Sequence, residues 1–174
     1  MTEDIDVLTP ADYAAAIPDL AALLVDAVES GASVSFLSGL DLPRAKLWWQ
    51  ERTADVGSGS LVMIVARGSD RIVGCAGLAP ARTENGRHRA EVIKVLVLRS
   101  HRGRGVASAI LQRLESVALG LGRWLLVLDT AVDVGADRFY LRQGWLEVCT
   151  VPDFAMGTSG ELVATRFMWK RLAR

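Results

Sequence analysis

The chain has 174 residues, of which 51% are hydrophobic, and its 20 basic residues balance its 20 acidic residues. This length and hydrophobicity are typical of one compact domain with a substantial core, so we expect a single domain over residues 1–174. A formal net charge of zero provides no overall field to attract nucleic acid or an anionic membrane, and we expect neither as a partner. Cys75 and Cys149 lie in apolar, strand-like segments, and no signal peptide or long apolar span precedes them. These features favour a reduced, cytoplasmic protein.

Hydrophobic periodicity divides the chain into strands and helices. Short apolar runs predict about seven strands, and apolar residues at helical intervals predict about four helices. The strands are expected at residues 5–8, 61–66, 72–80, 90–98, 125–128, 145–151 and 162–169, and the helices at residues 11–28, 43–54, 108–120 and 135–143.

Turn residues predict how these elements are connected. A glycine-containing turn at residues 67–70 predicts an antiparallel hairpin, and the Asn85-Gly86 pair is a signal for a second hairpin. The step from strand 90–98 through the long helix to strand 125–128 is a parallel crossover. The fold class is therefore α/β, with a mixed, mostly antiparallel sheet flanked by helices.

The most specific chemical motif is the glycine-rich run between strand 90–98 and the helix that follows it, Arg102-Gly103-Arg104-Gly105-Val106-Ala107. Glycines let the backbone approach an anion closely, and amides at the start of a helix carry the positive end of the helix dipole. With two arginines beside them, such amides suit a pyrophosphate, although a solvent-exposed turn is the alternative. The spacing matches neither the G-x-G-x-x-G fingerprint nor a P-loop, which disfavours both.

No metal site is predicted from the sequence. Neither cysteine has a histidine nearby or belongs to a cluster with metal-ligand spacing, so a small buried hydrophobic role is expected for both. His88 and His101 flank turns, where a solvated imidazole is expected, although either could carry charge near a bound anion.

Several of these segments together resemble the signature of the GNAT superfamily of N-acetyltransferases: Val95-Leu96-Val97, Arg102-x-x-Gly105-x-Ala107, Phe139-Tyr140 and Gly144-Trp145. The resemblance covers most of the chain and implies the GNAT fold, with acetyl-CoA as the cosubstrate. More narrowly, the tabtoxin-resistance type of these enzymes is resembled by Gly31-Ala32-Ser33-Val34, Arg89-Ala90-Glu91-Val92, the Arg-Gly-Arg-Gly turn, Leu128-Asp129-Thr130 and Phe139-Tyr140. The chain departs from the family at Arg99, where proline is common, so the start of the loop is expected to differ.

The resemblance implies a coenzyme site beside the glycine-rich run. The pantetheine arm should lie like an extra strand against Val95, Leu96 and Val97, and an amide near Val97 should polarise the thioester carbonyl. The pyrophosphate should be bound by the run and the first residues of the helix: Arg102, Gly103, Arg104, Gly105, Val106, Ala107 and Ser108.

The resemblance also implies three catalytic residues. Acetyl transfer needs an uncharged amine, so a base helps to generate the nucleophile, directly or through water. Glu91 and Asp129 match acids thought to serve as bases in the tabtoxin-resistance enzyme, and Tyr140 matches the acid that protonates the departing thiolate. Three structural alternatives stay open: an ion pair with Arg89 for Glu91, a cap for residues 130–132 for Asp129, and ring packing in the core for Tyr140.

The acceptor side is harder to predict. Phe36 and Trp49 belong to the segment that lines the amine site in the resembled family, and an apolar wall would favour a neutral or amphipathic acceptor. Adjacent residues on a helix face different ways, so at least one of Trp48 and Trp49 should lie in the core or at an interface.

The leading prediction is transfer of an acetyl group to the primary amine of a small molecule, such as an amino acid, a toxin or an antibiotic, with resistance as one candidate role. A protein or peptide acceptor is an alternative, and a non-catalytic acyl-CoA-binding module is another. The presence of Tyr140, Glu91 and Asp129 together favours chemistry over mere binding. The apolar last strand, residues 163–169, is compatible with a homodimer.

Overall fold

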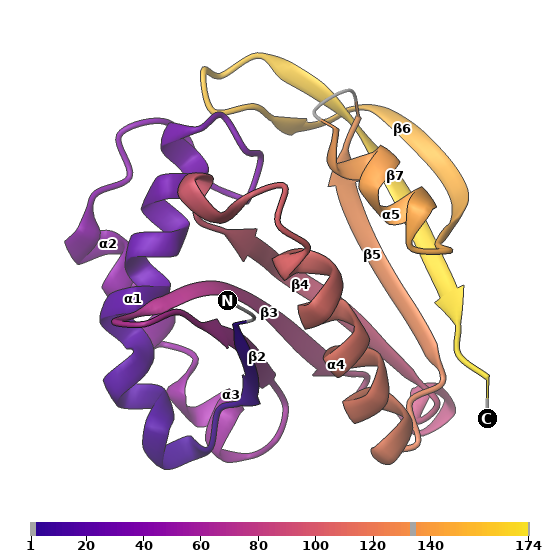
Figure 1. The fold of residues 1–174 in the computed structure, drawn as a ribbon. Helices are drawn as coiled ribbons and strands as arrows, with labels where there is room; N and C mark the ends of the chain where they lie inside the picture. Colours follow the sequence, from indigo (N-terminus) through magenta and orange to yellow (C-terminus); the bar gives the residue numbers. More distant parts are fainter. Residues whose placement is uncertain (1–2, 133–134, 174) are drawn as a thin grey trace.

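The computed structural model describes residues 3–132 and 135–173, which contain both helices and strands (Figure 1). The strands span Asp4–Val7 (β1), Val62–Arg67 (β2), Ile72–Pro80 (β3), Arg89–Val97 (β4), Leu125–Ala131 (β5), Leu146–Met156 (β6) and Leu162–Arg171 (β7). The α-helices span Pro10–Glu29 (α1), Leu42–Gln50 (α2), Thr53–Gly57 (α3), Val106–Gly120 (α4) and Ala136–Arg142 (α5). Two 3-10 turns lie at Glu84–Gly86 (η1) and Arg99–His101 (η2).

The strands form one seven-stranded sheet in the order β1-β2-β3-β4-β5-β7-β6. Each neighbouring pair is antiparallel except β4 and β5, which are parallel, as expected for the crossover through α4. The predicted mixed, mostly antiparallel sheet is therefore confirmed.

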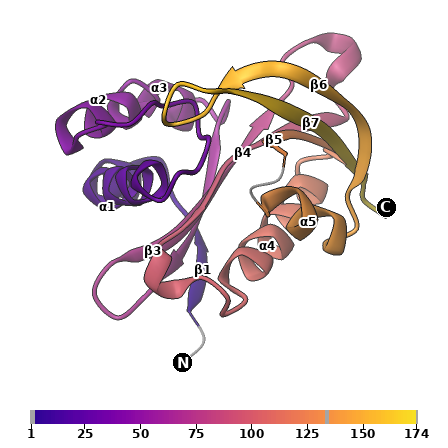
Figure 2. The same ribbon diagram turned by 90° about the horizontal axis from the view of Figure 1, so that it is seen from above.

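Two hydrophobic cores lie on opposite faces of the sheet. Helices α1, α2 and α3 cover one face, and α4 and α5 cover the other (Figure 2). Side chains alternate along a strand, so Met63 packs in the core beneath α1 while its neighbour Ile64 packs in the core beneath α4. The same alternation along β4 and β5 decides which side chains face which helices at the site described below.

The helix predicted at residues 43–54 is two helices, α2 and α3. Its start is as expected, because Asp41 caps α2 by accepting a 2.9 Å hydrogen bond from the amide of Arg44, and Pro43 lies in the first turn. The helix is interrupted where Thr53 Oγ1 donates to the carbonyl of Gln50 and the Arg52 guanidinium donates to the carbonyl of Trp48. Side-chain hydrogen bonds to the last carbonyls of a helix compete with its continuation, which explains the break.

Strands β3 and β4 pair as predicted, but the Asn-Gly turn does not connect them as expected. A two-residue type I′ turn needs positive φ at both central residues, and neither Asn85 nor Gly86 has it. The connection is instead a longer loop containing η1. Gly86 serves close packing there, since a Cβ at this position would lie 2.6 Å from Thr83 Oγ1.

The C-terminal strands differ from the prediction in two ways. The loop expected after Val151 is strand through Met156, with a bulge that places Asp153 at φ 53°. Strand β7 lies inside the sheet, so the free edge belongs to β6, which leaves Cys149 exposed rather than buried. The homodimer stays a prediction, and the edge open to it is β6.

Candidate active site

Strands β4 and β5 separate soon after they begin (Figure 1). They pair over Arg89–Glu91 and Leu125–Val127, and beyond these residues their facing edges have no strand partner in the described part of the chain. A cavity of about 560 Å³ opens at this gap. Its lining comes from the end of α1 and the loop after it, from β4, β5 and α5, and from α4, namely residues 27, 30–35, 91–97, 102, 107, 129–131, 136, 139 and 140.

The glycine-rich run forms a turn that exposes main-chain amides at the start of α4. Gly103 and Gly105 have φ values of 74° and 86°, and Gly105 is the N-cap of the helix, whose first turn has no side-chain cap. The first amides of an α-helix have no partner within the helix, so they are available to an anion. Val106 contributes its backbone to this turn while its side chain packs in the core, and Ala107 lines the cavity.

A close contact between backbone and helix fixes the position of α4. A Cβ added to Gly74 on β3 would lie 2.9 Å from Ile110 Cδ1 and 3.1 Å from the carbonyl oxygen of Leu96. Only glycine therefore lets the first turns of α4 pack this closely on the sheet, beside the β4 residues Val95 and Val97. An extended ligand with a pyrophosphate, such as acetyl-CoA, fits the open edge of β4 and the bare amides of α4.

The two arginines of the run have different environments. Arg102 Nε donates a 3.0 Å hydrogen bond to the carbonyl of Val97, and its Nη2 donates a 2.8 Å bond to Ser30 Oγ. This guanidinium therefore braces β4 against α1. Arg104 is exposed and makes no hydrogen bond or ion pair with another described residue, so it is the cation left free to meet an anion.

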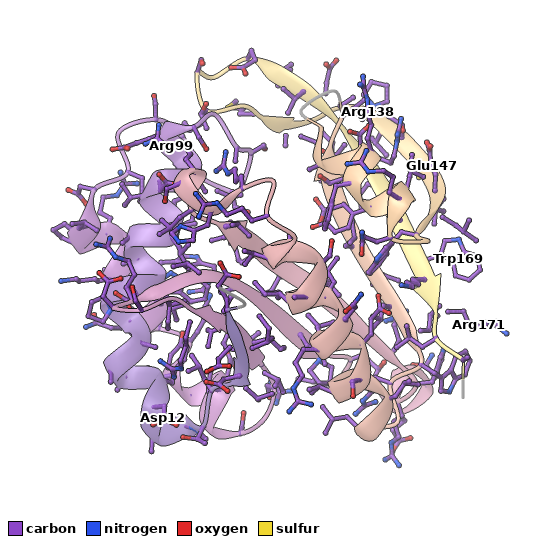
Figure 3. All side chains as sticks on the ribbon, in the orientation of Figure 1. Asp12, Arg99, Arg138, Glu147, Trp169 and Arg171 are labelled. Carbon is purple, nitrogen blue, oxygen red and sulfur yellow. The ribbon has the colours of Figure 1, made fainter. Side chains whose placement is uncertain are left out.

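The position where the family commonly has proline is used for a contact that proline could not make. The main-chain amide of Arg99 donates a 2.9 Å hydrogen bond to Asp26 Oδ2, and its Nε donates a 2.8 Å bond to Asp26 Oδ1. Arg99, labelled in Figure 3, also lies 3.2 Å from Glu29 Oε2. The loop before α4 is thus clamped to the C-terminal end of α1.

The two predicted bases lie on one face of the sheet. Their strand neighbours Ala90 and Leu128 pack in the core beneath α4, so Glu91 and Asp129 point to the opposite face, the side of α1. Glu91 is in register with Val127, two residues before Asp129, which brings both carboxylates to the point where the strands separate. Both are exposed, and neither makes a hydrogen bond or ion pair with a described residue, so the structure gives no sign of the predicted Arg89 pair or the predicted cap.

Tyr140 closes the cavity from the other side of the gap. Its ring is 8% exposed and packs at 5.3 Å from Phe139 and 5.8 Å from Trp145, measured between ring centroids. Core packing and a place in the cavity lining are therefore combined in one residue. Burial, followed by the negative charge of Asp129, raises the pKa of the hydroxyl above its usual value near 10, so the group is protonated at neutral pH.

The prediction for Trp49 is wrong. Its side chain is fully buried and belongs to the core beneath α1, so it lines no part of the cavity. Its neighbour Trp48 is only partly buried, with an edge-to-face contact to Phe36 at 5.9 Å and its ring centroid 5.1 Å from Nζ of the cavity residue Lys94. Phe36 packs against the same core and lies outside the cavity lining.

One cavity residue, Lys94, was not predicted from the sequence. It lies in the middle of β4, at φ 50°, and its ammonium donates 3.0 Å hydrogen bonds to the carbonyl of Val34 and to Ser35 Oγ. A lysine inside the apolar run from Val92 to Leu98 was the available signal, because lysine is rarely buried without a reason.

Two further findings concern the described residues as a whole. Within residues 3–132 and 135–173, no group of three His, Cys, Asp or Glu side chains is arranged to hold a metal ion. The helices of the same two segments include none that is both long and apolar enough to cross a membrane.

The sequence profile of the Acetyltransferase (GNAT) family matches residues 25–145, a stretch that contains the separating strands, the turn before α4 and Tyr140. The chain belongs to this family, and the protein is an acetyl-CoA-dependent N-acetyltransferase.

Solved structures of the family share the whole fold. The ribosomal-protein-alanine N-acetyltransferase of Brucella melitensis has a TM-score of 0.76 and 26% identity, over 97% of this chain and 99% of that one. The yncA protein of Salmonella typhimurium, solved with its cofactor acetyl-CoA, has a TM-score of 0.76 and 20% identity, over 100% and 96% of the two chains. A GCN5-related N-acetyltransferase from Kribbella flavida has a TM-score of 0.77 and 22% identity, over 98% of each chain.

Proposed function

We propose that the enzyme transfers the acetyl group of acetyl-CoA to the primary amine of a small, amino-acid-like molecule. One observation carries the proposal: two carboxylates without partners among the described residues, Glu91 and Asp129, share a cavity with the protonated phenol of Tyr140. The carboxylates and the phenol line different sides of the gap between β4 and β5. A base and an acid on either side of a thioester are what direct acetyl transfer requires.

Each residue group has a separate role in this proposal. When bound, acetyl-CoA supplies the acetyl group as a thioester. The amides from Gly103 to Ser108 bind the pyrophosphate, and the open edge of β4 at Val95–Val97 orients the pantetheine arm. Asp129 or Glu91 accepts the proton that the attacking amine loses, directly or through water. The Tyr140 hydroxyl gives its proton to the sulfur as the carbon–sulfur bond breaks.

A contact between two loops near the cavity favours a small acceptor over an extended peptide. The amide of Ser38, in the loop after α1, donates a 2.8 Å hydrogen bond to the carbonyl of Thr158, in the turn between β6 and β7. Figure 1 shows these two segments meeting across one end of the molecule. An open groove for an extended peptide would need these loops apart.

The five segments that resemble the tabtoxin-resistance type support an amino-acid-like or dipeptide-like acceptor. Each of them contributes at least one residue to the cavity lining: Gly31, Glu91, Arg102, Asp129 and Tyr140 are examples. The resemblance is therefore concentrated around the cavity, at its coenzyme end and at its acceptor end. A role in resistance, a cytoplasmic location and a homodimer complete the proposal.

A protein acceptor is the second candidate, because the Brucella melitensis structure, at 26% identity, is that of a ribosomal-protein-alanine N-acetyltransferase. A non-catalytic acyl-CoA-binding module is the third. Two carboxylates without ion-pair partners among the described residues, together with a buried tyrosine, favour catalysis over that third candidate.

Release of free thiol from acetyl-CoA tests the proposal with a panel of small primary amines and N-terminal peptides. We expect turnover with at least one small amine, lower turnover in Asp129→Asn or Glu91→Gln, and unchanged affinity for CoA in both variants. Turnover only with peptides would favour the second candidate, and binding of CoA without turnover on any amine would favour the third.

A further inference from the structure

We propose that Lys94 forms a subsite for a carboxylate of the acceptor, so that the enzyme prefers amines that carry a free carboxylate over neutral amines. This inference rests on the proposed function and adds to it the chemical class of the acceptor. It assigns a binding role to a residue beside the catalytic groups, and it follows from where the backbone directs the lysine side chain.

A bulge in β4 turns Lys94 towards the acceptor side. On β3, Ala76 alone separates the residues paired with Ile93 and Leu96, whereas on β4 both Lys94 and Val95 lie between them. Ile93 packs in the core beneath α1, and regular alternation would send Lys94 to the opposite face. The extra residue and the positive φ of 50° instead place two successive side chains on the α1 face.

The ammonium of Lys94 has a donor to spare. Two of its three N–H groups are used by the carbonyl of Val34 and by Ser35 Oγ, each at 3.0 Å. It lies 5.1 Å from the ring centroid of Trp48, and no carboxylate of the described residues comes within 4.0 Å of it. A half-buried cation in a ligand cavity without a negative partner is matched by a ligand that carries one.

The neighbouring cation, Arg52, is already paired. Its Cζ lies 3.4 Å above the Trp48 ring centroid, its Nη1 is 3.6 Å from Glu51 Oε2, and the same nitrogen donates to the Trp48 carbonyl. Arg52 therefore adds positive potential to this end of the cavity, while Lys94 is the group with a free donor. Burial first and Arg52 second lower the pKa of Lys94, which indicates that its charge is under-compensated when the site is empty of anions.

The cavity thus has two poles of opposite charge: a carboxylate pole at Glu91 and Asp129, and a positive pole at Lys94. Glu91 and Asp129 lie on the same face of the sheet as Lys94 and act on its charge, but neither forms an ion pair with it. An acceptor with an amine and a carboxylate fits this arrangement, with the amine at the carboxylate pole and its own carboxylate at Lys94. The alternative is that Lys94 only tethers the loop at Val34 and Ser35, in which case every acceptor would suffer equally from its loss.

Matched pairs of acceptors separate these two roles. The panel contains glycine, β-alanine, 4-aminobutanoate, 5-aminopentanoate and L-phenylalanine, each beside its primary amide. Because the amide also has a lower amine pKa than the acid, each kcat/KM is calculated for the fraction of acceptor that is present as neutral amine. Both kcat/KM in thiol release and binding to the CoA-loaded protein by calorimetry are measured for the wild type, Lys94→Met, Lys94→Arg and Lys46→Met. Lys46 is an exposed lysine on α2 and provides the matched control.

We expect at least one acid to be bound and acetylated about 10- to 100-fold better than its amide, since a hydrogen bond between charged groups is stronger than one to a neutral group. The ratio should fall to about one in Lys94→Met through loss of the acid alone, persist in Lys46→Met, and be partly kept in Lys94→Arg. Equal use of acid and amide by the wild type overturns the inference without any variant. The inference is also overturned if the preference for the acid survives in Lys94→Met, or if Lys94→Met loses acid and amide equally. It is overturned as well if none of the acids binds.

The two proposals can fail separately. Selective binding of acids without acetyl transfer would leave the Lys94 subsite standing and remove the proposed function. Turnover of neutral amines alone would keep the proposed function and remove the subsite.

Discussion

In the proposed site, the coenzyme end and the acceptor end of the cavity are built from different parts of the chain. At the coenzyme end, consecutive residues from Gly103 to Ser108 present main-chain amides, and the side chain of Val106 is turned into the core. At the acceptor end, Ser35, Lys94 and Asp129 come from a loop and two strands that meet only in the folded protein. A ligand common to a whole family can be bound by backbone, whereas a ligand particular to one enzyme needs side chains.

The comparison also separates two kinds of sensitivity. Most substitutions leave a main-chain amide in place, and only proline removes its N–H, so the coenzyme end should respond mainly to changes that alter backbone conformation. The acceptor end should respond to loss of single polar atoms, since its polar groups belong to side chains. The following variants test this difference, from the largest expected effect to the smallest.

Removing the hydroxyl of Tyr140 should have the largest effect. We expect Tyr140→Phe to lower kcat by about 100- to 10,000-fold, the range typical of a lost general acid, and to leave the Kd for CoA unchanged. Because burial and Asp129 raise the pKa of Tyr140 above its usual value, its ionisation should cause no loss of kcat in wild-type profiles up to about pH 10.

Tyr13→Phe is the matched control for that variant. Tyr13 is also fully buried, and its hydroxyl donates a 2.9 Å hydrogen bond to the carbonyl of Trp49, away from the cavity. Its loss should cost about 1 kcal/mol of stability and leave kcat unchanged. Equal kcat values in Tyr140→Phe and wild type would contradict the role assigned to the acid.

Straining the backbone should be the most effective way to damage the coenzyme end. We expect Gly105→Val to weaken CoA binding about 10- to 100-fold, because the left-handed conformation costs a side-chain-bearing residue about 1–2 kcal/mol and the side chain would stand where the pyrophosphate lies. Isothermal titration with CoA measures this change.

Gly122→Val provides the control, since Gly122 also has positive φ and open space around its Cβ position but lies beyond the far end of α4. It should lose similar stability and keep its CoA affinity. Arg104→Ala should weaken CoA binding only about fivefold, as for one exposed ion pair. A larger loss in Arg104→Ala than in Gly105→Val would reverse the distinction between backbone and side-chain ends.

The charge of Lys94 should leave a signature in stability as a function of pH. Its pKa is lowered in the folded protein, by burial and by Arg52, so between that pKa and the unfolded value of about 10.4 the unfolded chain holds more protons. The free energy of unfolding of the wild type should therefore rise relative to that of Lys94→Met as pH increases through this window. Below this window the lysine is fully charged, and its burial destabilises the wild type by the full amount. Urea unfolding of both proteins at pH 7, 8.5 and 10 measures the difference between their free energies of unfolding. A difference that does not change with pH would contradict a lowered pKa of Lys94.

The smallest effect is expected from the side-chain clamp beneath the coenzyme end. Arg99→Ala removes the contacts of an exposed guanidinium with Asp26 and Glu29, which solvent screens, so we expect only a small loss of stability. The main-chain bond from residue 99 to Asp26 would remain. Arg71→Ala, which removes a more exposed pair with Asp70, should cost less, and thermal unfolding compares the two variants.

What the sequence predicts follows the same division. The turn before α4 is one contiguous stretch, so its glycines, its helix start and its place after an apolar strand can all be recognised locally. The fold is predictable for the same reason, because periods of two and about 3.6 residues mark each strand and helix. The position of Glu91 and Asp129 on the same face of the sheet also follows once the crossover between their strands is recognised.

The acceptor end depends on contacts that local patterns do not encode. The bulge at Lys94 arises from the register of β4 against β3, and no residue within β4 predicts a bulge from the sequence alone. The choice between Trp48 and Trp49 depends on how α2 is rotated against α1, where the Tyr13 hydroxyl reaches the carbonyl of Trp49. A single sequence therefore predicts that one tryptophan is buried without predicting which one.

The separation of β4 from β5 also has a consequence for how the protein opens. Three residue pairs join the sheet formed by β1–β4 to the one formed by β5–β7, so the seam is the weakest line of main-chain hydrogen bonds across the molecule. In the proposed binding mode, the coenzyme lies along this seam and contacts both halves of the sheet, so its binding should stabilise the seam. At a concentration 100 times its Kd it should add about 2.7 kcal/mol to the free energy of unfolding, and amide hydrogen exchange should slow first along Val95–Val97.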